Sequence, residues 1–248
     1  MHFPNFVADA QALPLSGDFM FDTVIVDEGQ DFQPQWRDQV LRHARPDARI
    51  LWLEDPLQNL YGHPLTALPG WVGMRANVNY RSPRSIVRMH ELLLPAGMDI
   101  EAASPIEGED VEFLSYADHA GLIRGVKDGI GLCLKAGFAW SDIALLSFRG
   151  REGSRLSAFT QLGEHTLRTF TGDYDATGRP VYGDGDILSD SVYRFKGQSA
   201  PAVVLCEVDF AALDEKSVRK LFVGATRATM KLVLVLSDRA AAELLKTN

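Results

Sequence analysis

Two adjacent carboxylates follow an apolar run near the start of the chain. In FDTVIVDEGQDF, Phe21 to Phe32, the apolar run ends at Val26 and is followed by Asp27 and Glu28. Ligands of open α/β sheets bind beyond the carboxyl ends of the strands, so one carboxylate could hold Mg²⁺ there while its neighbour accepts a proton from an attacking water. The pair could equally cap the next helix or stay solvated. This segment by itself favours neither interpretation.

A second apolar run also ends in acids. It is LWLEDPLQNLYG, Leu51 to Gly62, in which Gln58 and Tyr61 follow the acids. A glutamine beyond a strand end can contact a terminal phosphate or position a water molecule. The alternative is a turn with an exposed amide, and it is the better interpretation of this segment taken alone.

A tyrosine and an arginine stand side by side in NVNYRSPRSIV, Asn77 to Val87. Tyr80 offers a flat surface for a base, and Arg81 offers a planar cation that can bind a phosphate through two hydrogen bonds. Pro83 ends the preceding segment and starts a predicted helix. A surface arginine beside a partly buried tyrosine would give the same pattern.

Two further segments place basic residues next to apolar strands. In SVYRFKGQSAPAVVL, Ser191 to Leu205, Lys196 lies in a loop predicted between two strands, where a lysine and backbone amides could meet a phosphate. In KLFVGATRATMKLVLVLS, Lys220 to Ser237, Arg227 follows a helical stretch and precedes a buried strand at the edge of a domain. A solvated loop and a helix end are the alternatives.

The elements that would position these residues alternate along the chain. Strands are predicted at Thr23–Val26, Ile50–Leu53, Val111–Ser115, Ile143–Ser147, Val192–Phe195, Val203–Glu207 and Leu232–Leu236. Helices are predicted at Pro34–His43, Pro83–Leu94, Ala117–Ala136 and Asp214–Ala225. Runs that are apolar at every position are typical of parallel strands buried on both faces, so the alternation predicts an α/β fold with a parallel sheet. The segment Thr171 to Asp190 is predicted to form loops and a hairpin.

The composition argues against a membrane-spanning protein and against binding of nucleic acid through overall charge. The chain has 248 residues, of which 46% are hydrophobic and 23% charged, and no run approaches the ~20 apolar residues of a membrane-spanning helix. We therefore expect a cytoplasmic protein without a membrane partner. The net charge of −8 argues against nucleic-acid binding by bulk electrostatics but allows a local basic groove. Cys133 and Cys206 form no CxxC motif, and Cys206 is predicted to be a buried free thiol.

The order of the segments is more informative than any one of them. DEGQD, EDPLQNLY, NYRS, RFKGQ and VGATRA resemble motifs II to VI of the UvrD/Rep-like superfamily 1 DNA helicases, and the resemblance to the C-terminal part of that family runs from Phe21 to Ser237. It implies a complete second RecA-like domain at residues 73–248, preceded by a partial first RecA-like domain at residues 1–72. A composition shift at Leu65–Val72 marks the boundary. Such helicases bind ATP between two RecA-like domains and walk along single-stranded DNA as the cleft closes and opens.

The resemblance implies catalytic roles. Asp27 would coordinate Mg²⁺, Glu28 would activate the hydrolytic water, and Gln58 would contact the γ-phosphate of ATP. Arg227 is similar to the arginine finger of the family, which stabilises the charge that develops on the transferred phosphoryl group.

The resemblance also implies contacts with the nucleotide. Tyr80 would stack on the adenine, and Arg81 would bind the γ-phosphate. Gly197 and Gln198 are assigned to the nucleotide as well. The chain departs from the family here, because Ser199 stands in place of the glutamate that helps to bind the sugar.

Contacts with DNA are implied for residues in two segments. They are Tyr61, His63, Ser191, Tyr193 and Lys196. His63 replaces an aromatic residue of the family, and an imidazole can still stack on a base. Tyr193 stands where a histidine is common.

The phosphate-binding loop of the family is missing from the chain. No GxxxxGK(S/T) sequence occurs, and the glycine pair Gly150 and Gly153 has neither the spacing nor the lysine. We therefore expect a C-terminal fragment that needs a missing N-terminal portion to hydrolyse ATP, with single-stranded DNA at a duplex junction and the nucleotide as further partners. The alternative is a naturally degenerate, non-hydrolysing module that binds nucleic acid or protein. The intact catalytic residues favour the helicase, because a binding module needs neither a metal carboxylate nor an arginine finger.

Overall fold

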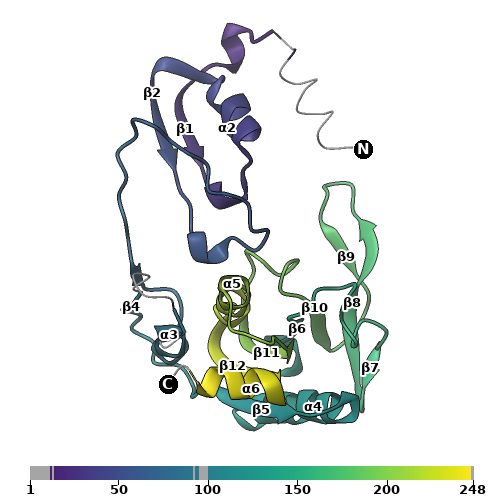
Figure 1. Ribbon diagram of the computed structural model, residues 1–248. Coiled ribbons are helices and arrows are strands. Elements are labelled where there is room, and N and C mark those ends of the chain that lie inside the picture. The colour runs from purple at the N-terminus through teal and green to yellow at the C-terminus, as the bar shows by residue number, and fades with distance from the viewer. Residues whose placement is uncertain (1–11, 13, 92, 95–99, 247–248) are drawn as a thin grey trace. The chain divides into compact units, whose positions relative to one another are not determined.

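The structure is a computed structural model that describes residues 12, 14–91, 93–94 and 100–246. The chain divides into two compact units, Met1–Met74 and Arg75–Asn248, which we call unit 1 and unit 2 (Figure 1). None of the helices in the described part of the chain is long and apolar enough to cross a membrane.

Unit 1 is built on a pair of parallel strands. β1 (Phe21–Val26) pairs with β2 (Ala44–Trp52), and α2 (Pro34–Leu41) lies between them in the sequence. α2 starts at a proline, whose fixed φ suits the first helical turn and whose missing N–H costs nothing there. The unit also contains the short 3₁₀ helices η1 (Gly17–Phe19), η2 (Gly29–Asp31) and η3 (Pro56–Gln58).

The two faces of the β1–β2 sheet differ. On one face, the ring of Trp52 lies 5.3 Å from that of Phe32, which in turn lies 6.4 Å from that of Trp36 in α2. On the other face, the paired residues Ile25 and Leu51 are 62% and 53% exposed. Because parallel sheets are normally covered on both faces, the described part of unit 1 leaves an apolar sheet face open.

Unit 2 contains a largely parallel sheet of 8 strands. Its order is β5 (Glu112–Tyr116), β12 (Ala228–Ser237), β11 (Ala200–Val208), β6 (Ile143–Ser147), β10 (Ile187–Ser191), β8 (His165–Tyr174) and β7 (Gln161–Leu162). Neighbours from β5 to β8 in this order are parallel, whereas β7 and β9 (Pro180–Tyr182) are antiparallel to β8. The carboxyl ends of β6, β10 and β11 therefore meet at one edge of the sheet. β3 (Val78–Asn79) and β4 (Glu101–Ala102) form a separate parallel pair.

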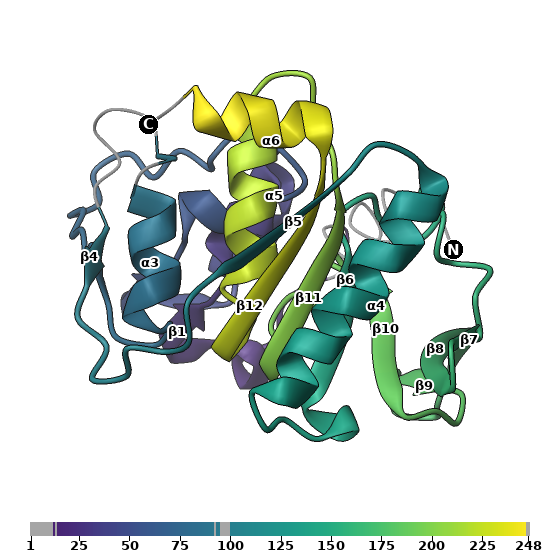
Figure 2. The ribbon, with the colours of Figure 1, turned by 90° about the horizontal axis from the view of Figure 1, so that it is seen from below.

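Helices cover both faces of this sheet. α4 (His119–Lys135) lies on one face, and α5 (Glu215–Ala225) and α6 (Asp238–Leu245) lie on the other, as Figure 2 shows. α3 (Arg84–Glu91) packs beside α5, and η4 (Trp140–Asp142) precedes β6. Gly224 lets α5 approach β11 closely, since a Cβ at this position would come within 2.8 Å of Leu205.

The core of unit 2 forms between α4 and the central strands. β6 is buried along its whole length. Leu122, Val126 and Ile130 of α4 pack against Val204 and Val233 of the sheet, all of them buried. This rigid centre supports the loops at the carboxyl edge of the sheet.

Most predicted elements are confirmed, with shifts at their ends. The predicted mixed α/β fold with a parallel sheet is present, and α2, α3, α4 and α5 occur where helices are predicted. Residue 92, within the predicted helix Pro83–Leu94, lies outside the described residues. The predicted strand Val192–Phe195 is wrong, because this segment forms turns in which Phe195 donates its N–H to the carbonyl of Ser191. Val192 and Phe195 are buried by a turn that folds onto the end of β10.

Of two smaller predictions, one is confirmed and the other is confirmed in part. Cys133 and Cys206 are both buried and free. The segment Thr171 to Asp190 includes the β8–β9 hairpin, whose turn is held by Asp175, the acceptor of hydrogen bonds from Thr177 and from the N–H of Arg179. The prediction is wrong for the end of this segment, which forms the start of β10 and not a loop.

Candidate functional site

The carboxylate pair lies where β1 ends. Asp27 is exposed, and its Oδ1 accepts a hydrogen bond of 2.9 Å from the N–H of Glu28. Glu28 has a left-handed backbone with φ 55°. Such a conformation costs a non-glycine residue on the order of 1–3 kcal/mol and is concentrated at functional sites. An exposed carboxylate at a strand end fits Mg²⁺, which needs only one or two protein carboxylates and takes its other ligands from water and phosphate.

Gln30 joins the carboxylate pair to the loop that follows β2. It is fully buried (0% exposed), its amide N–H donates to the carboxylate of Glu28, and its carbonyl accepts from the N–H of Asp55 at 2.9 Å. Asp55 in turn accepts from the side-chain amide of Gln58 at 2.8 Å. We call this hydrogen-bonded chain, Glu28–Gln30–Asp55–Gln58, the Gln30 relay. It connects two residues with predicted catalytic roles through two residues that the sequence analysis missed.

A close contact with Trp52 fixes the backbone next to the relay. A Cβ at Gly29 would come within 2.2 Å of Nε1 of Trp52, so only glycine lets the chain pass the indole. The indole N–H donates to the carboxylate of Glu54 at 3.1 Å. The end of β2 therefore shapes the turn that follows β1.

Tyr61 and His63 form a stacked pair. Their rings lie 5.9 Å apart at an interplanar angle of 26°, and Tyr61 is exposed. The side chain of Asn59 holds the turn, because it donates to the carbonyl of His63 at 2.7 Å and accepts from the N–H of His63 at 3.2 Å. The two predicted DNA-contact residues of unit 1 thus share one platform of flat rings.

Tyr80 and Arg81 lie in a turn that Asn79 organises. The side-chain carbonyl of Asn79 accepts from the N–H of Arg81 at 3.0 Å and from the N–H of Ser82 at 2.8 Å. Tyr80 and Arg81 are both exposed, whereas Ser82 is buried. The turn therefore presents an aromatic ring and a guanidinium to the surface of unit 2, as a nucleotide contact requires.

The loop after β10 carries the predicted DNA contacts of unit 2. Ser191 is buried at the end of the strand, and Tyr193 and Lys196 are partly exposed. The ammonium of Lys220 lies 5.4 Å from the ring centre of Tyr193 and 4.5 Å from that of Phe148. Burial lowers the pKa of Lys220. This lysine links the Ser191–Gln198 loop to the loop that follows β6.

Arg227, the predicted arginine finger, is enclosed by its own unit. It is 2% exposed, and its guanidinium donates to the carbonyl of Val223 at 3.0 Å and to the carbonyl of Gln198 at 3.2 Å. Gly197, the residue before Gln198, has a left-handed backbone with φ 82°. The predicted finger and the predicted nucleotide contacts Gly197 and Gln198 therefore meet where α5 ends. Its Nη2 also donates to the hydroxyl of Thr226 at 3.3 Å, and at 2% exposure the guanidinium can meet a phosphate outside unit 2 only if it or its surroundings move.

Asp209, the residue just beyond β11, forms ion pairs with two arginines. Its carboxylate pairs with Arg149 at 2.5 Å and with Arg239 at 2.5 and 2.7 Å, and it accepts from the hydroxyl of Ser237 at 2.7 Å. The hydrogen bond from Arg239 is the main cause that holds the pKa of Asp209 well below its usual value, and those from Ser237 and Arg149 act in the same direction. Asp209 thus fixes the loop after β6 to the start of α6.

Glu207, a residue of the sheet, accepts hydrogen bonds from the same loop, the one that follows β6. It is buried near the end of β11 with a left-handed φ of 58°. Its carboxylate accepts from the hydroxyls of Ser147 and Ser154, each at 2.6 Å, and from the N–H of Arg155 at 2.7 Å. The sequence analysis missed Glu207 because it placed this residue at the end of an apolar strand, although an acid in such a run was a usable signal.

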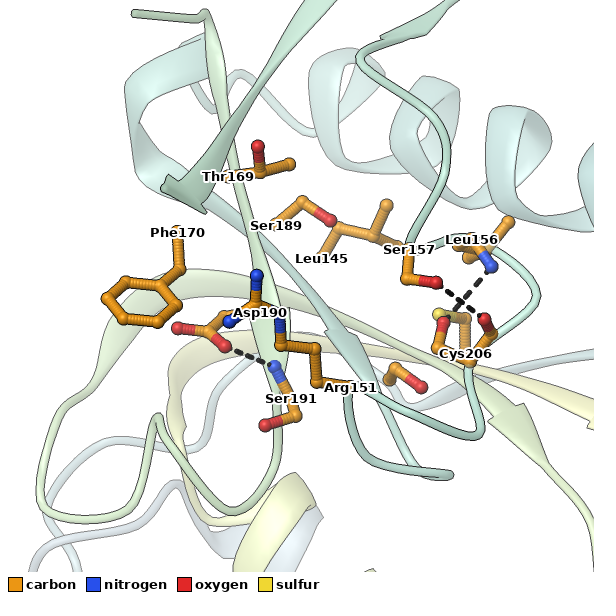
Figure 3. A pocket seen from close by; sticks show the side chains of 12 residues that line it. Leu145, Arg151, Leu156, Ser157, Thr169, Phe170, Ser189, Asp190, Ser191 and Cys206 are labelled. Carbon is orange, nitrogen blue, oxygen red and sulfur yellow. Dashed lines mark hydrogen bonds between the residues drawn. The ribbon is translucent and has the colours of Figure 1, made fainter. Parts of the chain in front are cut away.

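A cavity of about 80 Å³ opens at this edge of unit 2, at the ends of β6 and β10 (Figure 3). It is lined by Leu145, Ser147, Arg151, Ser154, Leu156, Ser157, Thr169, Phe170, Ser189, Asp190, Ser191 and Cys206. Only Ser191 among them is a predicted site residue. The others escaped the sequence analysis because they come from strands and loops far apart in the chain.

The structure thus groups the predicted site residues in small sets. Glu28 and Gln58 are joined by the Gln30 relay, and Asp27 adjoins Glu28. The remaining sets are Tyr61 with His63, Tyr80 with Arg81, Ser191 with Tyr193 and Lys196, and Gly197 with Gln198 and Arg227. The role of each residue stays a prediction.

Comparison with known proteins identifies part of unit 2. Residues 186–235 match the family model of the UvrD-like helicase C-terminal domain, and this stretch contains β10, the Ser191–Gln198 loop and Arg227. No curated protein matches the chain. A solved structure, the C-terminal domain of a possible DNA helicase from Lactobacillus plantarum, is similar with a TM-score of 0.45 and 14% identity, and the match covers 66% of this chain and 93% of that one. Residues 186–235 are thus similar to the UvrD-like helicase C-terminal domain, in agreement with the resemblance of the sequence to the C-terminal part of UvrD/Rep-like helicases.

Proposed function

We propose that this chain is the C-terminal motor part of an ATP-dependent DNA helicase or translocase of the UvrD/Rep type. In this proposal it hydrolyses ATP only together with an N-terminal portion that supplies the phosphate-binding loop. The observation that carries the proposal is the contact of Arg227 with the Ser191–Gln198 loop inside residues 186–235. Predicted catalytic, nucleotide and DNA residues meet there, within the stretch that matches a helicase domain.

Unit 2 serves as the second RecA-like domain in this proposal. Support comes from its parallel sheet with helices on both faces, a layout in which ligands bind at the carboxyl ends of the strands. The exposed Tyr80 and Arg81 would contact the base and the γ-phosphate of ATP. Arg227 would stabilise charge on the transferred phosphoryl group after its guanidinium or its surroundings move.

Unit 1 serves as the partial first RecA-like domain. In the described part of unit 1, Ile25 and Leu51 are more than half exposed on one face of the sheet, which supports the idea that further polypeptide covers this face. Asp27 would hold Mg²⁺, which neutralises phosphate charge when bound. Glu28 would accept a proton from the attacking water, and the amide of Gln30 orients its carboxylate for that purpose.

DNA binding tests the proposal directly. The chain should bind a dye-labelled single strand in a fluorescence anisotropy assay, with affinity that falls as salt rises. Lys196→Ala should weaken binding several-fold and reduce the slope of log K against log salt by about 0.7, as for one lost phosphate contact on a single strand. Lys135→Ala removes an exposed charge at the end of α4 and should change neither quantity. A chain without salt-dependent binding of single strands contradicts the proposal.

A second candidate is a non-hydrolysing interaction module, favoured by the enclosure of Arg227 among backbone carbonyls. The two candidates differ in what an added phosphate-binding portion does. A chain extended by that portion should turn over ATP in the presence of DNA if the helicase proposal is correct. It should bind DNA without turnover if the module proposal is correct.

A further inference from the structure

The end of the β8–β9 hairpin lies beside the loop that follows β10. β8 and β10 are parallel, and their ladder ends at Thr169, so residues 170–174 continue past it with β9 as their partner. Figure 1 shows this part of the hairpin extending beyond the rest of the sheet of unit 2. Because both strands run toward the carboxyl edge, the hairpin and the Ser191–Gln198 loop leave the sheet at the same edge.

The side chain of Arg194 reaches from the loop to the hairpin. Its Nη1 donates to the hydroxyl of Tyr174 at 3.0 Å, and its guanidinium lies 3.6 Å from the ring centre of Phe170. A cation over an aromatic ring is attracted by the quadrupole of the ring, and the attraction grows as water is excluded. The side chain of Arg194 is only 22% exposed, and Phe170 is buried. This arginine therefore ties the loop to the hairpin through contacts that are largely shielded from water.

Asp190 makes a second connection between the two segments. Its carboxylate accepts from the hydroxyl of Tyr182 in β9 at 2.5 Å and lies 3.5 Å from Nε of Arg194. At 4% exposure the carboxylate needs such partners, because burial of a charge without them is strongly unfavourable. Asp190 also accepts from the N–H of Ser191 at 2.7 Å (Figure 3), so the same group fixes the start of the loop. The hairpin is thus joined to the loop both at Arg194 and at the end of β10.

The backbone of Arg194 lies at the centre of the turn that carries the proposed DNA contacts. Its N–H donates to the hydroxyl of Ser191 at 3.3 Å, and its carbonyl accepts from the side-chain amide of Gln198 at 3.4 Å. Tyr193 immediately precedes Arg194 and Lys196 follows two positions later, and both are partly exposed. A fixed Arg194 therefore limits the directions in which these two side chains can point.

We propose that Arg194 is a positioning residue through which the β8–β9 hairpin holds the Ser191–Gln198 loop in its DNA-contacting form. A strand that immobilises the loop then immobilises the hairpin as well, because Arg194 is built into the loop and packed against the hairpin. The part of this inference that concerns DNA rests on the proposed function. The connection between hairpin and loop stands without it.

Amide hydrogen exchange of the free, whole chain tests the connection. In Arg194→Ala, the amides of the loop should exchange at least about tenfold faster, as expected for the loss of a hydrogen bond to a charged group. Tyr174→Phe removes a single hydroxyl from an exposed ring, so the chain still folds, and it should speed the same amides about two- to tenfold. Arg179→Ala is the matched control, since it removes an exposed arginine of the same hairpin and should leave the loop unchanged. Wild-type exchange of the loop in both Arg194→Ala and Tyr174→Phe overturns the proposal.

Exchange in the presence of oligo-dT tests the transmission from DNA to the hairpin. At strand concentrations that saturate each variant, oligo-dT should slow exchange in the loop and in residues 171–182 of the wild type. In Arg194→Ala the loop should still be protected by the strand, whereas the hairpin should lose its protection. A purely structural role of Arg194 would not separate the two segments in this way.

Two results of this second experiment overturn the transmission. One is protection of the hairpin that persists in Arg194→Ala, which would show that the strand contacts the hairpin directly. The other is a wild-type hairpin whose exchange stays unchanged while the loop is protected. A chain that does not bind oligo-dT contradicts the proposed function and the DNA part of the inference, and the exchange of the free chain then decides whether Arg194 connects the hairpin to the loop.

Discussion

Replacement of Gln30 by leucine should loosen unit 1 without changing its packing volume greatly. The substitution removes the donor to Glu28 and the acceptor of the N–H of Asp55, which lies 2.9 Å away. An unsatisfied buried polar group costs about 1–3 kcal/mol, and both partners are partly exposed, so the low end of that range, about 1–1.5 kcal/mol, applies to each. The expected loss is about 2–3 kcal/mol in the free energy of opening of unit 1, or roughly 30- to 150-fold faster amide exchange in β1 and β2.

Hydrogen exchange measured by mass spectrometry on peptides from β1 and β2 checks this estimate. Gln35→Leu is the control, because Gln35 is exposed and its amide only reaches the neighbouring Gln33. An exposed substitution of this kind should stay within about 0.5 kcal/mol of the wild type. Equal exchange in the two variants would refute the argument that the Gln30 relay holds unit 1 together.

Gln30→Glu sharpens the test through pH. It keeps an acceptor for the N–H of Asp55 but sets a second carboxylate against Glu28, which raises a carboxyl pKa in the folded state above its unfolded value. The destabilisation should therefore be full at pH 8 and should fade as pH falls and a proton binds the pair. A difference from the wild type that is the same at pH 5 and pH 8 would show that these carboxylates are not in contact.

Three further predictions concern catalysis and acid stability. The purified chain should release no phosphate from ATP above background, because it has no GxxxxGK(S/T) sequence; DNA-stimulated release that Glu28→Gln abolishes would contradict this. In a chain extended by a phosphate-binding portion, Arg227→Ala should lower turnover by about 10³-fold with much less effect on nucleotide affinity, and Arg227→Lys should rescue little; unchanged turnover would remove the finger assignment. Asp209, whose pKa Arg239 depresses most, should stabilise unit 2 above about pH 4 and lose that contribution as pH falls further. Asp209→Asn should thus flatten the acid side of urea unfolding free energies measured from pH 2 to 7, and an unaltered acid limb would count against this ion centre.

The parts of the fold that could be predicted from the sequence are those with an uninterrupted apolar signal. β6, β11 and β12 are apolar at nearly every position because they are buried on both faces of the sheet. β10 lacks this signal, since Ser189, Asp190 and Ser191 line the cavity instead of the core. Polar residues at the cavity thus concealed a central strand, and the buried residues after it were mistaken for one.

The candidate site shows the same division. Residues with a motif around them, such as Glu28 and Arg227, could be assigned from the sequence by resemblance. Gln30 and Glu207 could not, because a buried amide or carboxylate is recognised only through its partners. Asp55 lies 25 positions from Gln30, and the partners of Glu207 lie 52 to 60 positions from it. Tertiary structure alone brings them within reach.

Arg227 and the Ser191–Gln198 loop are thermodynamically linked through one guanidinium. Arg227 is 2% exposed, so an outward movement of its guanidinium toward an anion would break the hydrogen bond to the carbonyl of Gln198. An anion that draws Arg227 outward would therefore make the Ser191–Gln198 loop less ordered. By thermodynamic reciprocity, a DNA strand that orders the loop would lower the affinity of Arg227 for the anion by the same factor. One hydrogen bond to a charged group is worth about 1.5–3 kcal/mol, which limits this antagonism to roughly 10- to 150-fold. In the proposed motor, a negative coupling of this size between nucleotide binding and DNA binding would make the two binding events alternate.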